Sequence, residues 1–129
     1  MHEFNVCQSI VDTVIDRVSP SRLHTPQVMK VSVVIGALRP LLSENMRLAY
    51  ATLIKDTIAE GSHLHIKRLK ARGKCSRCGA LCEIAEMHFI CRKCGGKSGE
   101  IVGGRELYIE HIEIQEQIPE GSMEGHYVN

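Results

Sequence analysis

Two amphipathic helices and three strands can be predicted from the spacing of apolar residues along the chain. Apolar side chains recur at steps of three and four residues from Phe4 to Val18, with Asn5 as a candidate cap, which predicts a first helix with one buried face. Residues 28–35 are β-branched and alternate, which predicts a half-buried strand that ends near Gly36. Its expected inner face consists of Met29, Val31, Val33 and Ile35, and its outer face of Lys30 and Ser32.

The next segments repeat this order of helix and strand. Ser43 is a candidate cap for a second helix with apolar positions between residues 46 and 58, and Gly61 is a candidate stop. Residues 63–69 alternate weakly as a second strand, and the isoleucine-rich residues 106–114 predict a last one.

Two Cys-x-x-Cys pairs, each followed by glycine, lie between the last two predicted strands. Each pair can turn tightly enough to aim both sulfurs at one point, and two pairs complete a tetrahedral thiolate shell for zinc. The four ligands would be Cys75, Cys78, Cys91 and Cys94. A closed shell leaves no position for water or substrate, so the zinc is expected to be structural and the protein is not expected to be an enzyme. Apolar pieces at residues 81–84 and 87–90 predict a small hairpin between the pairs.

These elements predict an α+β fold: a small three-stranded sheet covered by two helices, with an inserted four-cysteine zinc-ribbon domain. The last strand has few apolar residues of its own, so we expect it to return to the first sheet. The expected boundaries are residues 1–70, completed by the returning strand 105–115, for the first domain and 71–104 for the zinc domain. Residues 116–129 lack periodicity and are expected to form a disordered tail.

Composition limits the class of protein further. The 129 residues carry a formal net charge of +1, which gives no overall electrostatic signal for nucleic acid or an anionic membrane. The longest apolar run, residues 33–38, is far shorter than the roughly 20 residues that span a bilayer. The chain opens with Met-His-Glu rather than a basic signal region, so we expect a cytoplasmic protein whose thiols stay reduced and bind metal.

A local basic patch supports an alternative function, that of a zinc-ribbon nucleic-acid-binding protein. The patch consists of Lys67, Arg68, Lys70, Arg72, Lys74 and Arg77. The near-neutral whole, the scarcity of aromatic side chains and the acidic residues of the last strand disfavour this alternative. The patch would serve equally well to dock an acidic protein.

The N-terminus offers a second metal site of a different kind. The α-amine of Met1, the His2 amide nitrogen and the His2 imidazole lie within chelating reach of one another. The amide or carboxylate of Glu3, or a water, would complete a tetragonal nitrogen and oxygen set that suits Ni(II) or Cu(II). The alternative interpretation is a solvated histidine ahead of a helix.

The Met-His-Glu start before an amphipathic helix, the paired Cys-x-x-Cys motifs and the segment Gly103-Gly-Arg-Glu-Leu-Tyr-Ile109 together resemble the HypA/HybF family of hydrogenase nickel-incorporation proteins. The resemblance extends to about Gln115. It implies Ni(II) as transient cargo at Met1, His2 and Glu3, beside structural Zn(II) at the four cysteines. It also implies a nickel metallochaperone that works with a nickel-handling maturation GTPase on the precursor of the [NiFe]-hydrogenase large subunit. Urease maturation proteins are further partners of some members, and the sequence leaves monomer and homodimer open.

Two further cysteines and a pair of histidines are also candidate metal ligands. Cys7 lies on the apolar stripe of the first helix and is interpreted as a buried small side chain. Cys82 either replaces a zinc ligand or packs on a short strand. His63 and His65 share one strand face, where exposed histidines are favoured over a second metal site.

Overall fold

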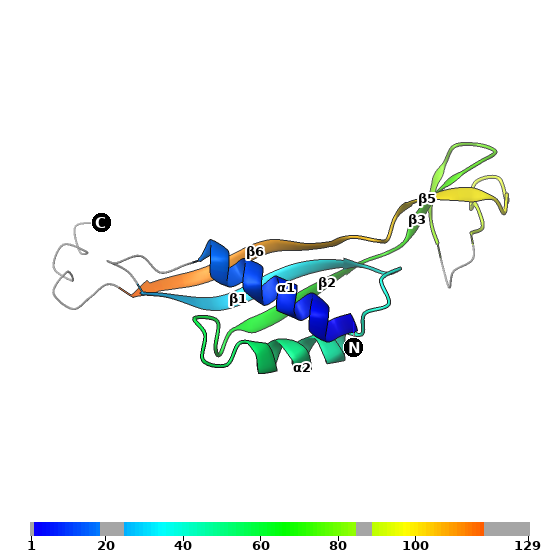
Figure 1. Cartoon of the computed structure of the whole chain (residues 1–129). Helices are drawn as coiled ribbons and strands as arrows, with labels where there is room; N and C mark the ends of the chain where they lie inside the picture. Colours follow the sequence, from blue (N-terminus) through cyan, green and yellow to red (C-terminus); the bar gives the residue numbers. More distant parts are fainter. Residues whose placement is uncertain (1, 19–24, 85–88, 118–129) are drawn as a thin grey trace, which may run out of the picture. The chain divides into compact units, whose positions relative to one another are not determined.

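The computed structural model describes residues 2–18, 25–84 and 89–117. In this part of the chain there are two helices and six strands (Figure 1). They are α1 (His2–Arg17), β1 (Thr25–Gly36), α2 (Ser43–Leu53), β2 (His63–Leu69), β3 (Arg72–Cys75), β4 (Leu81–Glu83), β5 (Gly99–Gly103) and β6 (Leu107–Gln117). None of the helices in these ranges is long and apolar enough to cross a membrane. Of the tail expected from residue 116 onwards, Glu116 and Gln117 belong to β6, and residues 118–129 lie outside the described residues.

The strands form two three-stranded sheets, with the orders β2-β1-β6 and β4-β3-β5. The last described strand, β6, returns to the first sheet, as the sequence predicts, and lies there beside β1. The predicted α+β class with a four-cysteine unit is therefore confirmed. The second sheet, called the ribbon sheet from here on, is formed differently from the prediction. β4 pairs antiparallel with β3, a partner the sequence did not predict, and the second piece of the predicted hairpin, residues 87–90, lies partly outside the described residues.

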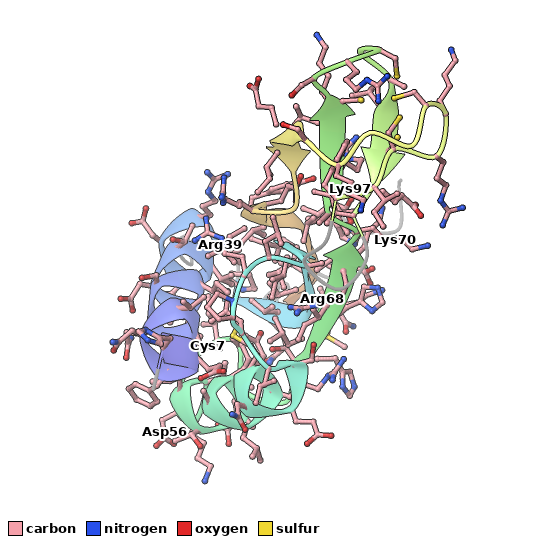
Figure 2. The ribbon with its side chains drawn as sticks, turned by 90° about the vertical axis from the view of Figure 1, so that its right-hand side faces the viewer. Cys7, Arg39, Asp56, Arg68, Lys70 and Lys97 are labelled. Atoms are coloured by element: carbon pink, nitrogen blue, oxygen red, sulfur yellow. The ribbon has the colours of Figure 1, made fainter. Side chains whose placement is uncertain are left out.

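Helices α1 and α2 lie on the same side of the first sheet (Figures 1 and 2). The buried face of α1 consists of Glu3, Cys7, Ile10, Val11 and Val14. These positions follow the three- and four-residue steps of the apolar pattern, because a helix returns to the same face at that interval. Met46 and Tyr50 are the buried residues of α2, and Cys7 Sγ lies 3.2 Å from the Met46 carbonyl oxygen. The two helices thus close one continuous apolar layer.

Both helix starts differ from the prediction. α1 begins at His2 rather than after Asn5, and the acidic Glu3 lies in its first turn, where the helix dipole favours negative charge. Ser43 does not cap α2; the residue before the helix is Leu42, and no side chain of its own caps it. The Leu42 N–H instead donates to the Glu3 carboxylate, so the two helix starts are joined.

Strand β1 is more buried than a half-exposed strand should be. Every residue from Val31 to Gly36 is buried, and Ser32 is only 1% exposed, although Met29 on the predicted inner face is 44% exposed. The alternation predicted for this strand is therefore wrong. β1 is the central strand of its sheet, so side chains of the flanking strands can cover its second face, as His111 of β6 does at 3.4 Å from Ser32 Oγ.

The internal contacts divide the chain into two units. Unit 1 consists of residues 1–32, 41–65 and 109–129, and unit 2 of residues 33–40 and 66–108. Within unit 2 the backbone passes very close to itself at Gly36, where an added Cβ would lie 2.1 Å from the Gly104 carbonyl oxygen. The Gly36 N–H donates to the Glu106 carbonyl at 2.8 Å, and the Leu38 N–H donates to the Gly104 carbonyl at 2.7 Å. Only glycine allows this approach at position 36.

Candidate metal centre

The four predicted cysteines meet at one place in unit 2. The sulfurs of Cys75, Cys78, Cys91 and Cys94 all lie within 4.8 Å of one another. Cys75 Sγ is 3.5 Å from Cys94 Sγ, and Cys78 Sγ is 3.6 Å from Cys91 Sγ. A zinc ion at about 2.3 Å from each sulfur of a tetrahedron would separate the sulfurs by about 3.8 Å. The four thiols therefore fit a zinc ion in size, number and chemical type.

Two tight backbone turns bring these sulfurs together. Gly79 and Gly95, which follow the two pairs, have φ angles of 75° and 76°, a region that side chains with a Cβ rarely adopt. Their N–H groups donate to the carbonyl oxygens of Cys75 and Cys91 at 3.0 and 2.8 Å, so each pair closes one turn. The glycine after each Cys-x-x-Cys is thus required by the turn itself.

The electrostatics of the cluster favour a cation. The backbone N–H of Cys94 is the main group that lowers the pKa of Cys91, to about 6. The N–H of Cys78 likewise lowers the pKa of Cys75. The Gly96 N–H acts in the same direction on Cys94, but the neighbouring thiols, Cys75 first, and burial outweigh it and raise the pKa of Cys94 to about 11. The pKa values of the thiols thus differ within one cluster, and a divalent cation that bound all four as thiolates would release the protons that they still hold.

A fifth sulfur lies next to the cluster. The Cys82 thiol, on β4, donates to Cys91 Sγ at 3.7 Å, but it does not belong to the group of four sulfurs that are mutually close. The sequence left Cys82 either as a ligand or as a packed side chain, and the geometry places it beside the ligand set rather than in it. This proximity could not be read from spacing because it depends on the pairing of β4 with β3.

The residues of the predicted N-terminal site differ in their surroundings. Met1 lies outside the described residues, and His2 is an exposed first residue of α1. Glu3 is 8% exposed, and its Oε2 accepts the Leu42 N–H at 2.9 Å. This bond is the main reason why the pKa of Glu3 is lowered to about 2. The Glu3 carboxylate thus has a structural partner that the sequence did not reveal, because Leu42 is distant in the chain and donates through its backbone.

The backbone nitrogens of His2 and Glu3 lie in the first turn of α1. The N–H groups in the first turn of a helix have no partner within the helix. A side chain can supply the partner instead, and the Glu3 carboxylate accepts the Glu3 N–H.

The other candidate ligands are accounted for by packing or exposure. Cys7 is fully buried, with its Sγ 3.7 Å from Met46 Sδ, and burial raises its pKa to about 11 (Figure 2). It is a packed side chain, as the sequence predicts. His63 and His65 are both exposed on β2. Neither belongs to a cluster of metal-ligating side chains within the described ranges.

Comparison with known sequences gives a match over nearly the whole chain. A family described as "Hydrogenase/urease nickel incorporation, metallochaperone, hypA" matches residues 1–114. A protein of Caldanaerobacter subterraneus subsp. tengcongensis named hydrogenase maturation factor HypA is 37% identical over 117 residues, which cover 89% of this chain and all of the relative. A protein of the same name from Acidithiobacillus ferrooxidans is 30% identical over 115 residues, with 89% of this chain and all of the relative covered.

Solved structures agree at the level of the fold. The solution structure of the Ni metallochaperone HypA from Helicobacter pylori is similar with a TM-score of 0.57 at 21% identity, over 87% of this chain and 96% of that one. A second solution structure of a HypA protein gives a TM-score of 0.64 at 21% identity, over 89% and 97% of the two chains.

Proposed function

Since this chain belongs to the HypA family of hydrogenase and urease nickel-incorporation metallochaperones, we propose that it binds Ni(II) at its N-terminus and helps to insert it into the precursor of a [NiFe]-hydrogenase large subunit. The observation that carries this proposal is the family match, which begins at the first residue and thus includes the Met-His-Glu start. The protein would act with a nickel-handling maturation GTPase in the cytoplasm, and with urease maturation proteins where urease is the client.

In this proposal nickel is held by nitrogen atoms rather than by a buried cage. The ligands are the Met1 amine, the amide and imidazole nitrogens of His2, and an atom of Glu3. We take the Glu3 amide nitrogen rather than the carboxylate as the ligand, because the carboxylate already accepts the Leu42 N–H. A tetragonal nitrogen set selects Ni(II) over harder cations, and an exposed site with few fixed ligands allows the metal to leave again.

The four-cysteine cluster has the complementary role. We assign it a structural Zn(II), because four thiolates close a tetrahedral shell and leave no position for exchange with a client. The proposed domains are the nickel-binding domain, residues 1–70 with the returning strand 105–115, and the zinc domain, residues 71–104.

Nickel titration of the zinc-loaded protein without an N-terminal tag tests the proposal. The wild type is compared with His2→Ala and with His63→Ala, which removes an exposed histidine from β2. We expect tight nickel uptake by the wild type and His63→Ala, and loss of nickel but not zinc in His2→Ala. Equal nickel binding by all three proteins would contradict an N-terminal site.

The same titration has a predicted pH dependence. The terminal amine has a reference pKa of about 7.7–8.0 and must lose its proton to bind nickel. Nickel binding should therefore release protons and weaken as the pH falls below that range. Affinity that does not change between about pH 8 and pH 6.5 would exclude the amine as a ligand.

A further inference from the structure

The net charge of this chain is near zero because its two units carry opposite charges that nearly cancel. Unit 2 carries eleven lysine and arginine side chains against four acidic ones, a formal net charge of +7. Unit 1 carries five against eleven, a formal net charge of −6. Four thiolates on a zinc ion would reduce the positive excess of unit 2 but would not remove it. A surface of one sign attracts partners of the other sign.

Many of these cations have no acidic partner in the structure as described. Some basic side chains of unit 2 are paired: Lys70 Nζ lies 3.6 Å from Glu83 Oε1, and Arg72 Nη2 lies 3.8 Å from Glu106 Oε2. No acidic partner is found within the described ranges for the exposed Arg68, Lys74, Arg77, Arg92, Lys93 and Lys97. Arg68, Lys70, Lys97 and Arg39 can be followed in Figure 2.

One part of unit 2 combines positive charge with exposed apolar side chains. A hollow of about 350 Å³ is lined by Ile101, Val102, Gly103, Arg105 and Glu106. Ile101 and Val102 are 41% and 45% exposed. Arginine side chains lie around this hollow: an added Cβ on Gly103 would meet the Arg72 guanidinium at 2.6 Å, and Arg39 Nε donates to the Arg105 carbonyl at 2.9 Å.

The backbone next to the hollow belongs to an edge strand. β5 pairs with β3 on one side and is the last strand in the order β4-β3-β5, so its other side has no strand in the described ranges. Arg72 is opposite Gly103 and Gly73 is opposite Ile101, which leaves Val102 as the extra residue of a β-bulge. Edge strands present unpaired backbone donors and acceptors, and another chain can add to them as a further strand.

We infer that the β5 edge and its hollow form a docking site for an acidic, extended segment of another protein, which adds to the ribbon sheet as a fourth strand. Its backbone would pair with β5, its apolar side chains would cover Ile101 and Val102, and its carboxylates would meet Arg39, Arg72 and Arg105. Guanidinium groups bind carboxylates through two parallel hydrogen bonds, which gives direction as well as attraction.

A protein partner fits this surface better than a nucleic acid. An apolar centre with a charged rim is the usual anatomy of a protein interface, whereas nucleic-acid interfaces are more uniformly polar and positive. Phe89, an aromatic side chain of this unit, lies over Gly73 and Gly99 and is thus engaged in packing rather than free to stack on a base.

The test uses the full-length, zinc-loaded chain and a fluorescent synthetic peptide in which glutamate alternates with valine. A peptide of lysine and valine, and a single-stranded DNA of equal charge, serve as probes of the alternatives. We expect salt-sensitive binding of the glutamate peptide, weak binding of the DNA and none of the lysine peptide. DNA binding tighter than that of the glutamate peptide, or no binding of the glutamate peptide, would overturn the inference.

Two matched pairs of variants separate a built site from general attraction to positive charge. Arg105→Glu changes the hollow, whereas Arg92→Glu makes the same charge change beside Cys91. The two positions test different places, because Gly99 at one end of β5 is opposite Cys75, whereas Gly103 at the other end lines the hollow. Val102→Glu changes the β5 edge, whereas Leu81→Glu changes the exposed leucine of β4. We expect Arg105→Glu and Val102→Glu to weaken peptide binding about tenfold or more and their partners to change it much less.

Zinc content is measured for all four variants to exclude loss of the ribbon. Equal weakening within each pair would mean that the peptide senses only net charge and would refute a site at β5. Sedimentation of the wild type at the same concentrations tests whether a second copy of the chain occupies the β5 edge. If the chain self-associates and Arg105→Glu abolishes this, the edge is occupied by a second copy and the inferred partner is wrong.

Discussion

The helix pair of unit 1 and the ribbon of unit 2 differ in how much apolar surface they bury, and therefore in what stabilises them. Unit 1 buries a layer of apolar side chains, among them Val14 and Met46, which are fully buried. In the described part of residues 71–104, the buried apolar side chains are Ala71, Cys75 and Cys91. A segment of this size cannot bury enough apolar surface to fold alone, and a metal usually supplies what is missing.

In the ribbon, one aromatic side chain packs on glycines instead of on a layer of apolar side chains. In the ribbon the ring of Phe89 lies directly on Gly73 and Gly99, where any added Cβ would come within 2.7 Å of it. This one ring, together with the cysteines, takes the place of a core. The stability of unit 1 should therefore depend on packing, and that of the ribbon on zinc. A substitution that unfolds one of them should leave the other folded.

Loss of a zinc ligand should have the largest effect, and it should be confined to the ribbon. Cys91→Ser removes a buried sulfur from the cluster, and zinc contributes apparent binding energies of roughly 10–16 kcal/mol in units of this kind. We expect loss of zinc and of the ribbon amide resonances, with the resonances of α1 and α2 retained. Cys82→Ser is the matched control, since it removes the neighbouring sulfur and should keep the zinc. Equal zinc loss in both variants would show that the ligand set is wrong.

A cavity between the two helices should destabilise unit 1, and by less than the loss of zinc destabilises the ribbon. Met46→Ala removes a fully buried side chain that contacts Cys7 and should lower the free energy of unfolding by about 2–5 kcal/mol. Leu48 lies on the same helix but is 69% exposed, so Leu48→Ala should change that free energy little. Denaturant unfolding followed by circular dichroism measures both, and zinc content should stay unchanged. Zinc loss in Met46→Ala would mean that the two units do not fail separately.

The sequence predicted the features that repeat and missed those that depend on distant partners. Helical spacing identified α1 and α2, and the Cys-x-x-Cys pairs identified the cluster, because local geometry alone determines both. The Met-His-Glu start and the cysteine pairs led to the family, whose description as a metallochaperone confirms the expectation that the protein is not an enzyme.

The errors have a common physical origin. β3 reads Arg-Gly-Lys-Cys and has no strand pattern, because its pairing follows from the cysteine turns and from Phe89 on Gly73. β1 was predicted half-buried because alternation cannot show that side chains of a flanking strand, such as His111 of β6, will cover its second face. The capping of α2 by Glu3, across a long stretch of chain, has no local signal at all.

The hydrogen bond between Glu3 and Leu42 should have the smallest effect on stability, and its pH dependence should appear only in acid. The bond from the Leu42 N–H is the main reason why the pKa of Glu3 is lowered from 4.5 to about 2. A carboxyl with a depressed pKa in the folded state contributes stability that is fully present above its unfolded pKa. This contribution is lost as the pH falls from about 4.5 towards 2, where the folded carboxylate takes up its proton. Unfolding midpoints of the wild type should therefore fall over this range more steeply than those of Glu3→Gln.

The control for this measurement must share every other acid-sensitive group, including the zinc thiolates, which also protonate in acid. Glu44→Gln meets this need, because it removes an exposed carboxylate from the first turn of α2 and leaves Glu3 in place. It should follow the wild-type pH profile, while Glu3→Gln departs from it between pH 4.5 and 2. If Glu3→Gln instead keeps the wild-type slope, the Glu3 carboxylate does not hold α1 to α2. It would then be free for nickel, and the preference for the Glu3 amide as the ligand would be wrong.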